Sequence, residues 1–243
     1  MTTIPKLIRL TPDVALEPFP LFPETEISAG ARDSNGKILF HDSTLWVTVG
    51  VWESEANLGR WMHWPVDEFM VIVAGEVVIV EEDRETVVQA GESFFIPKGR
   101  RCIWNQSGYA RKYMLMVDDG TNPVASLPVV KVDPDASLTV APPLPAEILL
   151  SAAPVQRDST LFRNQAGCLT GGVWESTAYS RRLIDFPRHE MMHLLDGSMT
   201  LTDGNGDSQT IMAGETVFLP MGTPNAWVSS ATVRKVYCSV QPE

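Results

Sequence analysis

Short runs of apolar residues, separated by polar and turn-forming residues, follow one another along the whole chain. In the first half they include LWVTVGVW, EFMVIVAGEVVIVEE, ETVVQA, SFFIP and KYMLMV. Each run is rich in β-branched residues and is bounded by Gly, Pro, Asp or Asn, which is the pattern of strands separated by turns. Such runs recur at intervals of about 8–12 residues, which favours a sandwich or barrel over alternating strands and helices. The chain is therefore predicted to be all-β.

The strand pattern occurs twice because the chain contains an internal repeat. The pentapeptide GVWES stands at residues 50–54 and again at 172–176, an offset of 122 positions, and Glu68 recurs as Glu190 at the same offset. Two copies of one domain therefore fill the chain. After a one-residue insertion in the second copy, the residues that recur at an offset of 123 are Gly91, Pro97, Gly99, Trp104, Arg111 and Lys112, matched by Gly214, Pro220, Gly222, Trp227, Arg234 and Lys235.

A polar, turn-rich stretch, DDGTNPVAS at residues 118–126, is the predicted link between the two copies. Beyond it, VVKV at 129–132 restarts the pattern of LIRL at 7–10. We therefore predict two tandem jelly-roll barrels, residues 1–120 and residues 121–243, each long enough to bury a core of its own.

Charge and composition limit the partners that the protein can have. Nineteen basic and thirty acidic residues give a net charge of -11, which opposes binding to nucleic acid or to anionic lipid. No apolar run approaches the ~20 residues of a membrane span, and MTTIPKLIRL lacks the apolar core of a secretory signal, so a cytoplasmic location is expected. The three cysteines have no pair spacing that indicates a disulfide framework or a zinc ribbon. The expected partners are a small molecule and a second copy of the chain in a homodimer.

The motif residues of both copies resemble the two motifs of the cupin superfamily. Glu68 is followed by six residues and Gly75, as at the end of the first motif, and Gly91, Pro97 and Gly99 match the second. Such glycines and prolines make hairpin turns that aim the strands of a small barrel. The resemblance implies two RmlC-like jelly-roll barrels and does not by itself specify a reaction.

A narrower resemblance is to the cupin_3 group, also called DUF861, which is similar to the barrel of ethanolamine-utilisation proteins. It is carried by Asp67-Glu68-Phe69, by Pro97-Lys98-Gly99 with Trp104, and by Arg111-Lys112-Tyr113. We expect the Arg-Lys pair in each copy to form solvated or interface salt bridges rather than ligand contacts, because surface charges usually contribute little.

The cupin resemblance implies a metal site in which imidazole and carboxylate groups hold Mn, Fe, Ni or Zn. Glu68 stands at the glutamate position and His63 at the second histidine position, whereas Trp61 replaces the first histidine and Cys102 the last. A Cys102 thiolate would complete a set of His63, Glu68 and Cys102 around one divalent transition metal. The alternative is that Cys102 is a small buried hydrophobe and that no metal binds.

The second copy has fewer candidate ligands than the first. Leu183, Asp185 and Asn225 stand at its three histidine positions, so no imidazole remains at a motif position. The C-terminal barrel is therefore expected to be mainly structural.

A barrel without metal could still carry out acid–base chemistry. Burial in an apolar barrel would raise the pKa of Glu68 and suit it to general acid or base work, with His63 as its orienting partner. The alternative is a structural carboxylate, because such groups are also perturbed. The side chains expected to line a ligand cavity are Trp61, Met70, Ile72, Cys102 and Trp104.

Two functional hypotheses follow from these observations. The first is a two-barrel protein that binds a small polar metabolite in its N-terminal barrel and acts as a lyase, isomerase or hydrolase through a metal or through Glu68 and His63. The second is a non-catalytic sensor or assembly protein with vestigial pockets, whose barrel edges pair between chains.

Overall fold

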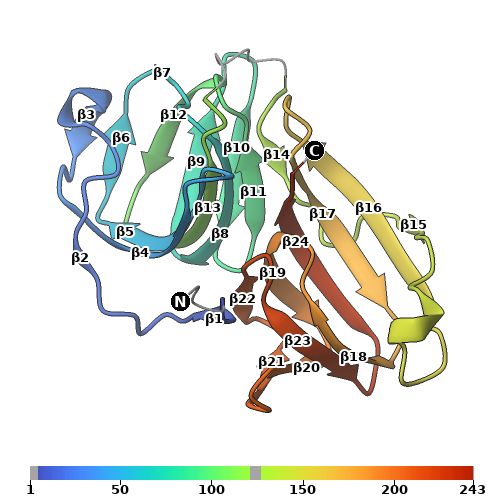
Figure 1. Ribbon diagram of the computed structural model, residues 1–243. Coiled ribbons are helices and arrows are strands. Elements are labelled where there is room, and N and C mark those ends of the chain that lie inside the picture. The colour runs from blue at the N-terminus through green and yellow to red at the C-terminus, as the bar shows by residue number, and fades with distance from the viewer. Residues whose placement is uncertain (1–4, 121–126, 243) are drawn as a thin grey trace. The chain divides into compact units, whose positions relative to one another are not determined.

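The computed structural model describes residues 5–120 and 127–242 (Figure 1). Over these residues the chain forms β-strands and two short 3₁₀ turns, η1 (Glu24–Glu26) and η2 (Ala146–Ile148). Within the described residues there is no helix long and apolar enough to cross a membrane. The prediction of an all-β fold built from two jelly-roll barrels is confirmed, whereas residues 121–126 of the predicted link lie outside the described residues.

The N-terminal barrel is made of two antiparallel sheets. Their strand orders are β14-β11-β8-β13-β5-β4-β2 and β10-β9-β12-β6-β3, and β7 pairs with β12. The strands are β2 (Glu17–Pro18), β3 (Ile27–Gly30), β4 (Ser34–Asp42), β5 (Val47–Ser54), β6 (Asn57–Gly59), β7 (Met62–His63), β8 (Asp67–Ala74), β9 (Glu76–Val80), β10 (Glu85–Gln89), β11 (Ser93–Ile96), β12 (Arg101–Gln106), β13 (Ala110–Val117) and β14 (Val130–Lys131).

The C-terminal barrel repeats this plan. Its strand orders are β1-β22-β19-β24-β17-β16-β15 and β18-β23-β20-β21. The strands are β1 (Ile8–Leu10), β15 (Thr139–Val140), β16 (Gln156–Arg163), β17 (Leu169–Ser176), β18 (Tyr179–Asp185), β19 (His189–Asp196), β20 (Ser198–Asp203), β21 (Ser208–Met212), β22 (Thr216–Leu219), β23 (Pro224–Ser229) and β24 (Val233–Val240).

The first strand of each repeat joins the sheet of the other barrel. β1 pairs with β22, where Ile8 lies opposite Phe218, and β14 pairs with β11, where Lys131 lies opposite Phe94. The compact units are accordingly Pro12–Val132, and Met1–Thr11 together with Asp133–Glu243. The sequence prediction divided the chain after residue 120. The likeness of residues 7–10 to 129–132 marks where a repeat begins, but it does not show which sheet its first strand joins.

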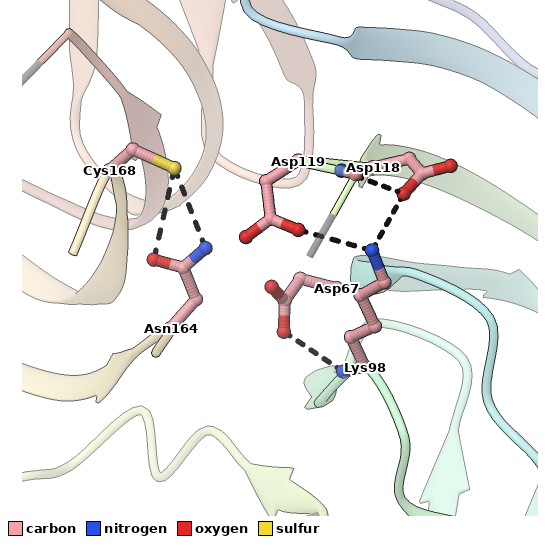
Figure 2. A network of polar contacts seen from close by, with 7 residues as sticks. Asp67, Lys98, Asp118, Asp119, Asn164 and Cys168 are labelled. Atoms are coloured by element: carbon pink, nitrogen blue, oxygen red, sulfur yellow. Dashed lines mark hydrogen bonds and ion pairs between the residues drawn. The ribbon is translucent and has the colours of Figure 1, made fainter. Parts of the chain in front are cut away.

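In each barrel, a backbone N–H of the second motif donates a hydrogen bond to a side chain of the first motif. In the N-terminal barrel the Lys98 backbone N–H donates to Asp67 Oδ1 at 2.9 Å, and Lys98 Nζ lies 2.7 Å from Asp118 Oδ1 (Figure 2). In the C-terminal barrel the equivalent Met221 N–H donates to His189 Nδ1 at 3.0 Å. The Pro-x-Gly turn is thus fixed to the start of the glutamate-bearing strand in both copies.

The glycines of the first motif are required by close backbone packing. Gly75 and Gly197 have φ values of 78° and 77°, in the left-handed region that favours glycine. A Cβ atom at Gly75 would lie 2.0 Å from the Tyr109 carbonyl oxygen, and one at Gly197 would lie 2.2 Å from that of Thr232. These turns carry the chain from β8 to β9 and from β19 to β20, that is, from one sheet of each barrel to the other.

Replacing Gly197 with alanine should therefore destabilise the C-terminal barrel. Gly206→Ala is the matched control, because Gly206 has a φ of 89° and no heavy atom within 4 Å of its built Cβ. The control should lower the free energy of unfolding by about 1–2 kcal/mol, the cost of a left-handed L-residue. Gly197→Ala should lower it clearly more, as measured by urea unfolding. Equal losses for the two variants would contradict the packing explanation.

Candidate functional site

A lysine and a glutamate form an ion pair inside each barrel. In the N-terminal barrel Lys112 Nζ lies 2.8 Å from Glu68 Oε1. In the C-terminal barrel Lys235 Nζ lies 2.5 Å from Glu190 Oε1. All four side chains are almost completely buried, and each lysine comes from the strand next to that of its glutamate. The repeat thus conserves a buried pair of opposite charges at equivalent places.

This pair corrects the expectation that the Arg-Lys dipeptides form solvated salt bridges. Arg111 and Arg234 bond glutamates on the neighbouring strands and stay partly exposed, but Lys112 and Lys235 point into the barrels. The sequence could have indicated this, because side chains two positions apart on a strand point to the same face, and Lys112 lies two positions before the core residue Met114 on β13.

The two lysines have the same kind of surroundings. Each Nζ lies close to a methionine sulfur and over the faces of two tryptophans, contacts that favour a cation. Burial lowers the pKa of both lysines, and the paired glutamates oppose this shift. The distances are 3.1 Å to Met70 Sδ, 5.3 Å to the Trp52 ring and 4.7 Å to the Trp104 ring for Lys112, and 3.0 Å to Met192 Sδ, 4.7 Å to the Trp174 ring and 5.8 Å to the Trp227 ring for Lys235.

Aromatic rings fill the interior of the N-terminal barrel around this pair. The second oxygen of Glu68 accepts a hydrogen bond from Trp64 Nε1 at 2.9 Å. The Phe22 ring lies 5.6 Å from that of Trp64, 5.9 Å from that of Trp52 and 6.0 Å from that of Trp104. A hollow of about 470 Å³ remains beside them. It is lined by Leu21, Phe22, Pro23, Glu26, Trp61, Met62, His63, Trp64, Pro65, Val66, Glu68 and Met116.

The predicted acid–base pair of Glu68 and His63 does not form. His63 is exposed, and its Nδ1 lies 3.1 Å from the Gly99 carbonyl oxygen. Over residues 5–120 and 127–242, no hydrogen bond joins His63 to Glu68, whose oxygens contact Lys112 and Trp64 instead. The two side chains do border the same hollow.

The side chains predicted to contact a ligand separate into two groups. Trp61 borders the hollow, is 39% exposed, and lies 4.5 Å from the Arg101 guanidinium. The others belong to the buried hydrophobic core and do not border the hollow. They are Met70, Ile72, Cys102 and Trp104.

The predicted metal ligands do not make a metal site. In the part of the chain that the structure describes, no three His, Cys, Asp or Glu side chains form a group that could hold a metal. Burial raises the pKa of the Cys102 thiol to about 12, so the sulfur is a neutral member of the core rather than a thiolate ligand. Both oxygens of Glu68 are already bonded within the protein. The set of His63, Glu68 and Cys102 therefore does not fit Mn, Fe, Ni or Zn.

The interior of the C-terminal barrel contains a cavity of about 390 Å³. Sequence reasoning did not predict it, since this barrel was expected to be mainly structural. Its polar lining on β16, β17, β19 and β24 consists of Gln156, Asp158, Thr170, Glu190, Lys235, Tyr237 and Ser239. Its apolar lining from η2, β18 and neighbouring loops includes Leu144, Ile148, Ile184, Phe186 and Pro187.

Glu190 is held as a carboxylate in this cavity by two cations. Arg188 Nε lies 2.5 Å from Glu190 Oε2, Lys235 bonds the other oxygen, and Ser239 Oγ donates to Oε2 at 2.9 Å. Burial would raise the pKa of Glu190, but the charges of Arg188 and Lys235 hold it at about 2. The carboxylate is therefore ionised at neutral pH.

Arg181 is a second arginine in the cavity wall, and it has no carboxylate partner. It is 5% exposed, and its guanidinium donates to the Asn225 carbonyl oxygen at 2.6 Å and to Asn225 Oδ1 at 2.5 Å. Among the residues that the structure describes, Arg181 forms no ion pair. Burial lowers the pKa of Arg181, yet an arginine stays charged in proteins. A buried positive charge therefore borders the cavity without a directly bonded carboxylate, and the charge of Glu190 compensates it only from a longer distance.

Differences between the two copies explain the added charge of the second barrel. Arg181 stands where the first copy has Gly59, and Arg188 where it has Val66, both at the offset of 122. Ser239 stands where the first copy has Met116. The buried Lys-Glu pair is common to both barrels, but the two arginines belong to the second alone.

Differences between the copies also change which side chains border the interior space. Leu144 stands where the first copy has Phe22, and Phe186 stands where it has Trp64. Both smaller side chains border the C-terminal cavity, whereas the rings of Phe22 and Trp64 contact each other and border the N-terminal hollow. A comparison of the copies for differences would have found this site, which the search for shared motif residues missed.

Two barrels with these motifs define a bicupin. A model of the EutQ-like cupin domain, Cupin_3, matches residues 45–113 and 164–237, which together make up more than half of the chain. The chain belongs to this family, and the resemblance found in the sequence is confirmed.

Solved structures agree with this assignment. A DUF861-family protein with unknown function from Pseudomonas syringae pv. tomato is 26% identical, has a TM-score of 0.83, and matches over 97% of this chain and 100% of its own. Ylba from E. coli, also of DUF861, is 11% identical with a TM-score of 0.57 over 99% and 93%. The Cupin 2 conserved barrel domain protein from Leptotrichia buccalis is 10% identical with a TM-score of 0.59 over 94% and 99%. The last two show the fold alone. No curated protein matches the sequence.

Proposed function

We propose that this protein binds a small organic carboxylate inside its C-terminal barrel and that the N-terminal barrel is mainly structural. The observation that carries the proposal is Arg181, a buried guanidinium at the cavity wall without an ion-pair partner among the described residues. Removing a charge from water is unfavourable unless an opposite charge compensates it. A ligand carboxylate supplies that charge, and the planar guanidinium suits its two oxygens.

The remaining contacts of Arg181 support a binding role. Asn225 accepts two hydrogen bonds from the guanidinium, and its own amide donates to the Thr223 carbonyl oxygen at 2.9 Å. Asn225 therefore holds the arginine in one orientation without supplying a negative charge. A cation positioned in this way before the ligand arrives loses little conformational entropy on binding.

This proposal places the ligand in a different barrel from the one that the sequence indicated. In the N-terminal barrel the buried cation and the buried carboxylate, Lys112 and Glu68, compensate each other. Its hollow is bordered mainly by apolar side chains, with His63 and Glu26 at its exposed side. The geometry supports a charged metabolite there less well than in the C-terminal cavity.

A panel of small carboxylates, each paired with its uncharged amide, tests the proposal on the full chain. Ligands that bind only the folded state raise the unfolding midpoint, so one or more carboxylates should raise it and their amides should not. No shift with any carboxylate would contradict the proposal and favour the alternative of an assembly protein with vestigial pockets. Light scattering on the same preparation checks the expected homodimer.

A further inference from the structure

We infer that the carboxylate taken by the C-terminal barrel is a monoanion with an apolar carbon skeleton, an inference that rests on the proposed function. The proposed function specifies only the group that meets Arg181. The charges, the walls and the size of the cavity limit the net charge, the polarity and the length of the ligand.

The charges of the cavity favour one negative charge on the ligand. Three cations border it, Arg181, Arg188 and Lys235, together with two carboxylates, Asp158 and Glu190. This leaves a single positive charge in excess. Arg188 and Lys235 are already bonded to Glu190, so the charge in excess lies at Arg181. A second carboxylate on the ligand would find no further unpaired cation among the described residues that border the cavity, and Asp158 and Glu190 would repel it.

One wall of the cavity is suited to a hydrocarbon surface. Leu144, Ile148, Ile184 and Phe186 all border the cavity, and they come from η2 and the segment before it, and from the end of β18 and the loop after it. None of these side chains can donate or accept a hydrogen bond, so a hydroxylated or charged body would lose its water there without replacement. An apolar body gains from leaving water.

The size of the cavity sets the length of the skeleton. A volume of about 390 Å³ corresponds to about 13 water molecules at ~30 Å³ each. A straight-chain carboxylate of six to eight carbons fits that space, whereas acetate would leave most of it unfilled. Affinity should therefore rise with chain length over this range.

Titration calorimetry with acetate, butyrate, hexanoate and adipate on the full chain tests the inference. Hexanoate and adipate share a six-carbon skeleton and differ by one carboxylate. We expect the Kd to fall about fourfold per added methylene, equivalent to ~0.8 kcal/mol, from acetate to hexanoate. We expect adipate to bind at least tenfold more weakly than hexanoate. Leu144→Phe, which introduces the side chain of the first copy, should weaken hexanoate and leave acetate unchanged.

The outcomes separate this inference from the proposed function. Adipate that binds as tightly as hexanoate would overturn the inference that the ligand carries one negative charge. An affinity independent of chain length would overturn the inference that its carbon skeleton is apolar. In both cases the proposed carboxylate site would survive. An absence of binding by all four compounds would overturn the inference, and the proposed function would be overturned with it only if the wider carboxylate panel also gave no shift.

Discussion

Lys112→Met should lower the free energy of unfolding by about 3–5 kcal/mol, the usual effect of removing one partner of a buried ion pair. Lys112 is the cation that compensates Glu68 inside the N-terminal barrel, and methionine keeps a similar volume while removing the charge. Lys235→Met is the matched variant in the C-terminal barrel. It should cost less, because Arg188 remains bonded to Glu190.

Urea unfolding of both variants at neutral pH measures these losses. The double variant Glu68→Gln/Lys112→Met should recover most of the lost stability, because it removes both charges rather than stranding one. Equal losses at Lys112 and Lys235 would show that Arg188 does not compensate Glu190 and would contradict the electrostatic account of the two barrels.

Arg181→Met should reduce the affinity for the carboxylate identified in the ligand panel by about 2–5 kcal/mol, the usual effect of removing one partner of a buried charge pair. This corresponds to a Kd roughly thirtyfold to several thousandfold higher. The physical reason is that the variant loses the cation without a carboxylate partner in the cavity wall, while the charges around Glu190 remain. Calorimetry measures the change.

Arg182→Met is the control for this prediction. Arg182 is the next residue, is exposed, and does not border the cavity. Arg182→Met removes the same charge as Arg181→Met. A loss of affinity in Arg181→Met alone is therefore due to the buried position and not to the change in net charge. Unchanged affinity in Arg181→Met would contradict the proposed site.

The fold was predictable from the sequence because two independent signals agreed. The short β-branched runs bounded by turn residues indicated the strands, and the recurring turn residues, such as Gly75 and Gly197, indicated the hairpins and the repeat. The exchange of β1 and β14 could not be predicted. Both strands are short and similar, and the choice of sheet depends on long-range pairing.

The candidate site was predictable only in part, and the physical reason lies in how a barrel cavity forms. The motif search found Glu68, which does face the barrel interior, but whether a cavity exists depends on the total volume of the side chains around it. Differences between the copies, such as Phe22 in the first and Leu144 in the second, change the lining of that interior at positions with no motif. Cys102 illustrates the same limit, because its burial decides that it is a neutral core side chain rather than a ligand.

The exchange of first strands also sets an order of events while the ribosome makes the chain. The N-terminal barrel lacks an edge strand until residues 130–131 are available, so it cannot be completed when its own repeat has been translated. Ile8 pairs with Phe218, which is 210 residues later in the chain. Synthesis of those residues takes roughly 10–40 seconds at the usual rate of translation. During that interval the newly made N-terminal segment has no strand to pair with. Chaperones or premature proteolysis would therefore act on this segment first.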